Sequence, residues 1–466
     1  MTVAGVVASV VIYLGLLTPL NVSDSLLARL FTTDKAAAYF ALIVIGSHVS
    51  RCGLRVIRQI PGLRIWGAML GFMAVSTALA PDLPDAVVAF ARVVIYSLFG
   101  VAQILIFRQV GAIRLFWKLW AYVACGFVLL GLTSSSNWLS AVGTEKAEFV
   151  VQTVDSSSFY ETYAITDATN RATVLWFAAN NLAYIIMPAL MYFLLELAVE
   201  RWRLIATLCA TGLFGLLVYG LVETASRGGT ISTICGCVVL LISLTRIKRI
   251  RGKSRGLPAL GVLAVGAVVI VVLAPGPAAS LMSRFSSAAH SAVAFWQWGW
   301  KPGMDATLVG DTQGDDASRV VTAELAYENI VQRPLLGWGG AWGGAKPMGT
   351  YYGATGNHLG YLNILGRYGL IGFSLNTALL VVCVRRLFDA IKMFRRSDPD
   401  RLAMGYWLGA YLVAMLVTNL FRTITAVDLA PCLLGYYLAA LCSRDAYGTS
   451  RLATQASQRQ QLVKRR

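Results

Sequence analysis

Charged residues are scarce in this sequence and make up only 14% of its 466 residues. A soluble protein usually carries roughly a quarter. Hydrophobic residues reach 57%, and the mean hydropathy is +0.64. Several uninterrupted apolar stretches of about 17 to 25 residues are long enough to cross a bilayer as helices. The composition therefore excludes a soluble globular protein and predicts an all-α polytopic membrane protein.

The sequence also lacks the histidine and cysteine patterns of metal sites and disulfide scaffolds. It has three histidines and eight cysteines, and the cysteines show no paired framework. The closest pair, Cys235 and Cys237, flanks a glycine inside an apolar run, where small packing residues are the simpler interpretation. A disulfide-rich or zinc-binding module is therefore not expected.

The apolar stretches predict twelve membrane-spanning helices in one domain that covers residues 1–466. Their expected bounds are 2–20, 35–49, 65–80, 86–106, 115–133, 173–197, 203–222, 229–246, 258–275, 358–384, 403–420 and 424–442. The net charge of +17 follows from topology, because membrane proteins concentrate Lys and Arg in cytoplasmic loops. With the N-terminus inside, the inner segments hold most of the 40 basic residues. Both termini are therefore expected to be cytoplasmic, and no nucleic-acid partner is implied.

Two long loops, 134–171 and 276–356, are expected to face outward. Within the larger loop, apolar residues recur at helical spacing, with Ser318 as the expected N-cap and Pro334 as the expected stop. The following stretch, LLGWGGAWGGAK, is either a flexible turn-rich loop or a tightly folded wall. In the second case its tryptophans could stack on sugar rings or lie in the membrane interface.

Two arginines on the outward side are candidate anion-binding residues. Arg227, in TASRGGTIS, is either a snorkelling or helix-capping residue or part of an anion site. In an anion site, the flanking glycines would let backbone amides approach the same anion. Arg319 follows Asp315 and Asp316, so a local salt bridge is the simpler interpretation of that segment alone.

His358 lies in GNHLGYLNILGRYGLIGF, where the chain is expected to re-enter the membrane. It is either a hydrogen-bonded residue at the mouth of a helix bundle or an imidazole that accepts a proton from a hydroxyl. If a helix continues from it, one face carries His358, Tyr361, Leu362 and Leu365. One histidine with two outward arginines indicates a diphosphate leaving group beside a hydroxyl acceptor. The other histidines, His48 and His290, are expected to be structural.

The order of these features resembles the O-antigen ligase and polymerase superfamily of membrane glycosyltransferases. That family has a late outward loop of the form R…P..G.G, followed by H-x-x-y-L-x-x-l-x-x-x-G-l-x-G. In this chain the pattern is carried by Arg319, Pro334, Leu336, Gly337, Trp338, Gly339, His358, Tyr361, Leu362, Leu365, Gly369 and Gly372. An earlier S-R-G segment matches residues 226–228. Two features depart from the family pattern: Leu359 follows the histidine in place of Asn, and Ala179-Asn180-Asn181 lacks the proline of N-P-N.

The resemblance implies a GT-C-like helical bundle in the bacterial inner membrane, with a periplasmic active site in which loop 276–356 takes part. Such enzymes move a glycan from undecaprenyl diphosphate to a sugar hydroxyl without a nucleotide donor, a bound metal or another cofactor. By resemblance, Arg227 and Arg319 would hold the donor diphosphate, and His358 would orient or deprotonate the acceptor hydroxyl. The supporting residues expected around them are Tyr361, Trp338 and Asn357.

Three activities are compatible with this pattern. We interpret the chain as an O-antigen ligase, which delivers the glycan to lipid A-core, with a polymerase that joins lipid-linked repeat units as the alternative. Twelve spans with both ends inside also fit a transporter. A transporter is expected to place charged or broken helices near the bilayer midplane, whereas only Arg92 lies well within an expected span.

Overall fold

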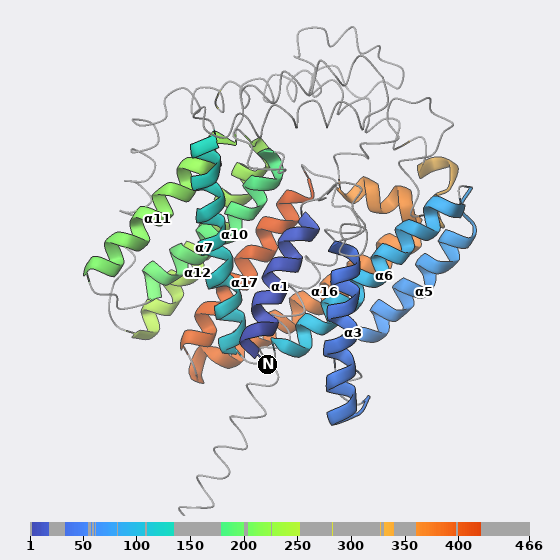
Figure 1. The fold of residues 1–466 in the computed structure, drawn as a ribbon, viewed down its shortest axis with the longest axis horizontal. Helices are drawn as coiled ribbons and strands as arrows, with labels where there is room; N and C mark the ends of the chain where they lie inside the picture. Colours follow the sequence, from blue (N-terminus) through green and yellow to red (C-terminus); the bar gives the residue numbers. More distant parts are fainter. Residues whose placement is uncertain are drawn as a thin grey trace, which may run out of the picture. The chain divides into compact units, whose positions relative to one another are not determined.

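A computed structural model gives the fold of the chain (Figure 1). It describes residues 2–17, 33–54, 57, 60, 62–81, 83–107, 110–134, 179–199, 204–224, 226–251, 282, 327, 330–339, 360–397 and 399–420. All regular elements within these ranges are helices. The prediction of an all-α chain is therefore confirmed for the part that the structure describes.

The helices fall where the apolar stretches of the sequence predict them. In chain order they are α1 (Thr2–Leu17), α3 (Thr33–Cys52), α5 (Leu63–Ala78), α6 (Leu83–Ile106), α7 (Val110–Ser134), α10 (Ala179–Val199), α11 (Leu204–Glu223), α12 (Arg227–Arg251), α16 (Gly360–Ser397) and α17 (Pro399–Thr418). Each overlaps one of the expected spans. The remaining two expected spans, 258–275 and 424–442, lie outside the described residues.

Several of these helices have the length and composition needed to cross a bilayer. Five segments qualify: Ala86–Ile106, Ala112–Leu129, Leu182–Val199, Arg227–Thr245 and Ile364–Asp389. Apolar side chains also lie on the exposed faces of the helices. Ile205 and Leu208 of α11, for example, are 76% and 62% exposed. Lipid tails tolerate such faces, and a helix satisfies its own backbone hydrogen bonds. The described helices thus fit a multi-pass membrane protein, and a total of twelve spans stays a prediction.

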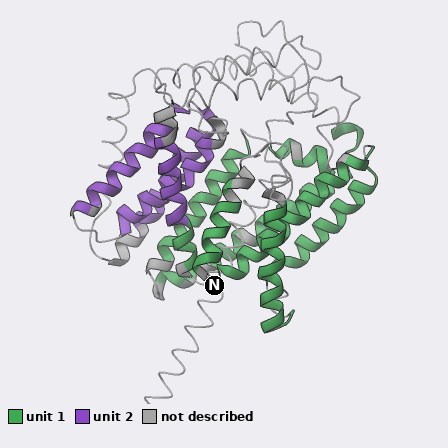
Figure 2. Cartoon of the chain, in the orientation of Figure 1, with its two compact units in different colours: residues 1–17, 21–116, 318–466 green, residues 18–20, 117–317 purple. Residues whose placement is uncertain are grey.

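The chain divides into two compact units (Figure 2). Unit 1 comprises Met1–Leu17, Asn21–Phe116 and Ser318–Arg466, and unit 2 comprises Thr18–Leu20 and Trp117–Ala317. In unit 1, α3 packs on α6, α6 on α5, α5 on α16 and α16 on α17. Trp66 of α5, which is almost fully buried, donates a hydrogen bond from Nε1 to Ser97 Oγ of α6 at 3.0 Å.

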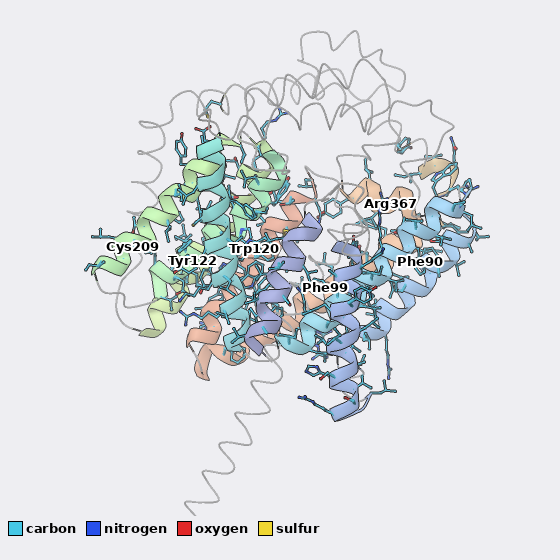
Figure 3. All side chains as sticks on the ribbon, viewed as in Figure 1. Phe90, Phe99, Trp120, Tyr122, Cys209 and Arg367 are labelled. Carbon is cyan, nitrogen blue, oxygen red and sulfur yellow. The ribbon has the colours of Figure 1, made fainter. Side chains whose placement is uncertain are left out.

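Unit 2 is built around α10, whose residues are almost all buried from Leu182 to Leu195. Trp120 of α7, labelled in Figure 3, donates from Nε1 to the Ile185 carbonyl at 3.0 Å. This carbonyl lies close to Pro188, and a proline inside a helix disturbs the ladder of backbone hydrogen bonds around it. A buried indole N–H therefore joins α7 to α10 about one turn before this proline.

The observed α16 differs from the expected span 358–384. It begins at Gly360, continues to Ser397 and is broken at Gly369, where φ is 61° and ψ is −169°. The extension has a local cause, because RRLFDAIKMFRR is basic but rich in good helix formers. The break has a tertiary cause, which lies in the segment that packs against it.

Candidate functional site

The S-R-G segment forms the N-terminal turn of α12 in unit 2. Ser226 directly precedes the helix, and its Oγ accepts a hydrogen bond from Gly229 N at 3.3 Å. This is the geometry of an N-cap. The Ser226 carbonyl accepts the first helical hydrogen bond, from Thr230 N at 2.9 Å. Arg227 is therefore the first residue of the helix, and its side chain is half-buried.

Gly229 lets this turn pack closely on α10. A Cβ added at Gly229 would lie 2.5 Å from Ala183 Cβ, which is closer than two carbon atoms can approach. Hydroxyl groups are buried along the same start of α12: those of Thr224, Ser226, Thr230, Ser232 and Thr233. Among the described residues, Thr230 Oγ1 and Ser232 Oγ have no hydrogen-bond partner. Helix N-termini favour anions, so this turn is compatible with the phosphate-binding role predicted for Arg227.

The second part of the predicted site is a short segment of unit 1, residues 333–339, which we call the latch. Helical residues end at Gln332, directly before Arg333 and Pro334. The expected stop at Pro334 is thus confirmed, because proline cannot continue a helix ladder and restricts the residue before it. The expected start of this helix at Ser318 lies outside the described residues.

Two glycines with positive φ interlock where the latch meets α16. Gly337 has φ 68°, and a Cβ there would lie 2.5 Å from the Arg367 carbonyl carbon and 2.6 Å from Gly369 N. Gly369 has φ 61°, and a Cβ there would overlap the Leu335 carbonyl group. Only glycine adopts the Gly369 backbone conformation at low energetic cost. The glycines of the motif are therefore explained by backbone packing at the break in α16.

Four backbone hydrogen bonds join the latch to α16 on both sides of the break. They run from Trp338 N to Gly366 O (2.9 Å), from Gly339 N to Arg367 O (2.8 Å), from Leu370 N to Pro334 O (2.7 Å) and from Ile371 N to Leu335 O (3.4 Å). A break leaves the neighbouring amides and carbonyls without helical partners, and unpaired buried backbone groups are costly. The latch supplies these partners and thereby stabilises the broken helix.

Helix α5 holds the latch from its other side. Ser76 Oγ, which is buried, donates to the Leu336 carbonyl at 2.8 Å. Arg333 Nη1 donates to the Leu79 carbonyl at 3.2 Å, and the Arg333 guanidinium lies 4.6 Å from the centre of the Trp338 ring. A cation in this position is attracted by the ring face. Trp338 therefore has one ring face covered by Arg333, and residues 335–339 of the stretch LLGWGGAWGGAK are folded against α5 and α16. Residues 340–346 of that stretch lie outside the described residues.

The start of α16 is tied to the end of α17. Tyr361 OH donates to the Leu416 carbonyl at 3.1 Å, and Gly360 N donates to the Asn419 carbonyl at 2.9 Å. Tyr361 is predicted to share a helix face with His358, which lies two residues before Gly360 and outside the described residues. In the structure the Tyr361 hydroxyl acts as an anchor for the first turn of α16.

Residues 212–377 match the family model described as O-Antigen ligase. The chain carries an O-antigen ligase domain. The matched range begins in α11, contains the start of α12 and the latch, and ends in α16 beyond the break at Gly369. No curated protein matches the chain in sequence. An O-antigen ligase domain identifies a glycosyltransferase-like enzyme of the ligase and polymerase type.

The O-antigen ligase domain contains all six residues predicted for the site, and the structure describes three of them. Trp338 and Tyr361 both belong to unit 1, and Arg227 belongs to unit 2. The other three, Arg319, Asn357 and His358, lie outside the described residues. Their convergence with Arg227 stays a prediction. Of the other histidines, His48 is described. Its Nδ1 lies 2.9 Å from the Val44 carbonyl oxygen in the same helix, which fits the structural role expected for it.

Sequence analysis missed two residues that surround the O-antigen ligase motif in the structure. Ser76 comes from α5, outside the matched range, and no sequence pattern connects it to the latch. Arg367 is the fourth residue of the candidate span Ile364–Asp389, and sequence analysis gave it no role. The sequence LGRYG could have indicated it, because a charged residue there lies seven positions after the start of an apolar helix. The match of residues 212–377 to the O-antigen ligase family disfavours a transporter.

Proposed function

We propose that this protein transfers a glycan from undecaprenyl diphosphate to a sugar hydroxyl of lipid A-core, at the periplasmic face of the bacterial inner membrane. The observation that carries the proposal is the O-antigen ligase domain at 212–377, which contains both candidate arginines and the candidate histidine. In this proposal the helices form a GT-C-like bundle with both termini in the cytoplasm. The loops 134–171 and 276–356 are then periplasmic.

The proposed reaction is a single displacement at the anomeric carbon of the donor sugar. The acceptor hydroxyl oxygen forms a bond to that carbon while the bond to the diphosphate oxygen breaks. His358 takes the hydroxyl proton, and undecaprenyl diphosphate leaves with the electron pair. Arg227 and Arg319 stabilise the negative charge that the leaving group gains, as fixed cations do in other phosphate-transfer sites. Attack from the side opposite the leaving group inverts the anomeric centre.

The contacts of α16 support a positioning role for the structure around His358. The helix begins two residues after this histidine, and its first turn is held by Tyr361 and Gly360 against α17. Seven to nine residues further on, the latch fixes the break. A base contributes to catalysis only when it is held within hydrogen-bond distance of the proton it accepts. Two anchored ends of one short helical segment provide such a fixed support.

The test of the proposal is glycan transfer by the purified full-length protein in detergent. The reaction contains an undecaprenyl-diphosphate-linked glycan and lipid A-core, with EDTA and without any nucleotide. We expect a product in which the glycan is attached to lipid A-core, and we expect EDTA to leave the rate unchanged. A requirement for a divalent cation would contradict the arginine-based charge stabilisation. Absence of transfer to any sugar acceptor would contradict the proposed function.

Three substitutions probe the predicted roles in the same reaction. His358→Ala should lower the rate roughly 10²- to 10⁴-fold, the usual contribution of a positioned acid or base. Arg227→Ala and Arg319→Ala should each lower it roughly 10²- to 10³-fold, as the loss of one charge-stabilising donor does. The matched control is Arg386→Ala, an exposed arginine of α16 beyond the matched domain. Near-normal activity of all three site variants would refute the assignment.

The polymerase alternative differs only in the acceptor. Offering a second undecaprenyl-diphosphate-linked repeat unit in place of lipid A-core distinguishes the two activities. A ligase leaves this acceptor unused, and a polymerase extends it by one repeat at each turnover. In cells, loss of a ligase leaves assembled polymer on its lipid carrier, whereas loss of a polymerase leaves single repeats.

A further inference from the structure

The backbone of Arg367, next to the break in α16, is fixed by contacts with other segments. Its carbonyl accepts the hydrogen bond from Gly339 N at 2.8 Å, and Ser76 Oγ lies 3.5 Å from the same oxygen. Gly337 packs directly against its carbonyl carbon. Two segments outside α16 therefore fix the position from which the Arg367 side chain extends (Figure 3).

The Arg367 side chain has a hydrogen-bond donor with no partner. Its Nε–H is buried and makes no hydrogen bond to any described residue. The residue as a whole is half-buried. A guanidinium is permanently charged, and leaving one of its donors buried and unpaired is costly. Charged residues within membrane segments are rare, and they usually face a partner or a functional cavity.

Two further polar groups without partners flank the same break. Thr77 is buried beside Ser76, and its Oγ1 has no hydrogen-bond partner among the described residues. Tyr368, the next residue after Arg367, is also buried, and its hydroxyl likewise has no partner in the described part of the chain. Most buried polar groups in proteins are paired, so three unpaired groups around one rigid backbone feature require an explanation.

Arg367 lies near the start of α16, the end of the helix that follows His358 in the sequence. Seven residues separate it from Gly360, which corresponds to about 10 Å along a helix axis. Arg367 is also the fourth residue of the candidate membrane span Ile364–Asp389, so it lies near one end of that span. The diphosphate of a membrane lipid lies at the ends of spans, where the hydrocarbon core meets the headgroups.

We propose that Arg367 is a further donor-binding residue, which pairs its guanidinium with an oxygen of the polyprenyl diphosphate of the donor. The proposal rests on the proposed function, because it assigns the partner from the donor of that reaction. A guanidinium fork matches two phosphate oxygens. Arg367 acts on binding of the lipid diphosphate, and it takes no part in proton transfer.

The test measures binding of undecaprenyl diphosphate, without glycan, to the purified full-length protein by native mass spectrometry in detergent. Arg367→Gln should weaken this binding roughly 10- to 100-fold, as expected when a charge-assisted hydrogen bond is lost. Undecaprenol, which has the same tail and no charge, should bind wild type and variant equally. Arg386→Gln should bind undecaprenyl diphosphate as the wild type does. Equal affinities of wild type and Arg367→Gln would overturn the proposal.

A second variant separates ligand binding from a structural role of the guanidinium. Arg367→Met keeps the length of the side chain and removes the charge, so it should lose the lipid diphosphate and keep the melting temperature of the lipid-free protein. A lower melting temperature with unchanged lipid affinity would mean that Arg367 pairs within the chain, and would overturn the proposal. Equal competition by phosphatidylglycerol would mean a general anionic-lipid site, which also overturns it.

The outcomes for Arg367 and for the proposed function are distinguishable. If wild type transfers glycan and Arg367→Gln binds undecaprenyl diphosphate normally, the function stands and the role of Arg367 fails. If wild type binds undecaprenyl diphosphate through Arg367 but transfers no glycan to any sugar acceptor, the proposed reaction fails and the role of Arg367 in binding the lipid diphosphate stands.

Discussion

The start of α12 and the break in α16 both depend on glycine, but they are stabilised in different ways. At the start of α12, a free backbone amide finds a hydrogen-bond partner nearby in the sequence, because Ser226 Oγ accepts from the amide of Gly229. At α16, the groups exposed by the break are satisfied by a segment about thirty residues away, the latch. A helix end capped by its own neighbouring residues tolerates changes in its surroundings. Hydrogen bonds between distant segments are lost when either segment moves. Substitutions in the two regions are therefore expected to differ in their effects.

The largest effect is expected at Gly369. Gly369→Ala places a Cβ on the Leu335 carbonyl and forces alanine into a backbone region that is almost restricted to glycine. We expect the free energy of unfolding to fall by about 3 kcal/mol or more, with little folded protein in membranes. The measurement is the melting temperature of the purified protein in detergent. Gly215→Ala in α11 is the control, because open space surrounds that glycine. A melting temperature equal to that of the control would show that the break is not fixed by the latch.

A smaller effect is expected at Gly229, where the overlap is with a side chain. Gly229→Ala should destabilise the protein by about 1 to 3 kcal/mol, because its Cβ overlaps Ala183 Cβ. The double substitution Gly229→Ala with Ala183→Gly should restore most of the melting temperature. No equivalent rescue is available at Gly369, where the contact is with backbone. If the double variant is no more stable than Gly229→Ala, contact with α10 is not the reason for this glycine.

The hydroxyl of Ser76 tests the support of the latch from α5. Ser76→Ala leaves the Leu336 carbonyl without its side-chain donor and should cost about 1 to 2 kcal/mol. It should also reduce glycan transfer, because it loosens the support of α16. Ser76→Thr keeps the donor and should recover part of the loss. Ser97→Ala, which removes a hydroxyl from α6 away from the latch, serves as the control: it should lower stability without a matching loss of transfer.

The N-cap of α12 is expected to give the smallest change. Ser226→Ala should cost about 1 kcal/mol, the usual value for an N-cap serine. Ser226→Asn should retain most of the stability, because its side-chain oxygen can accept the same amide hydrogen. Both variants are compared by melting temperature. A loss as large as that of Gly369→Ala would contradict the view that this turn is a local structure.

These two regions also show what the sequence can predict. The helices were predictable because a continuous apolar stretch is a local signal, and the stop at Pro334 follows from the chemistry of proline. The latch was recognisable only as a pattern of glycines and a tryptophan, because its partners are the carbonyls of Gly366 and Arg367. Backbone atoms carry no residue-specific signal. For the same reason Ser76, a serine in an apolar helix, gave no indication that it holds the latch.

The motif residues divide into those that build the backbone and those that carry the proposed chemistry. Gly337 and Gly369 are explained by the approach of two backbones. Tyr361 is explained by its hydrogen bond to α17. Structural contacts alone explain why these residues occur in the motif. Arg227, Arg319 and His358 are the residues of the motif to which the proposed glycan transfer assigns a chemical role.

The latch has a consequence for the stretch of chain that holds Asn357 and His358. This stretch leaves the latch at Gly339, whose amide is bound to α16, and rejoins α16 at Gly360, whose amide is bound to the end of α17. Both flanking glycines are thus tethered within unit 1. The chain therefore enters α16 from a fixed point, and this point lies two residues after His358 in the sequence.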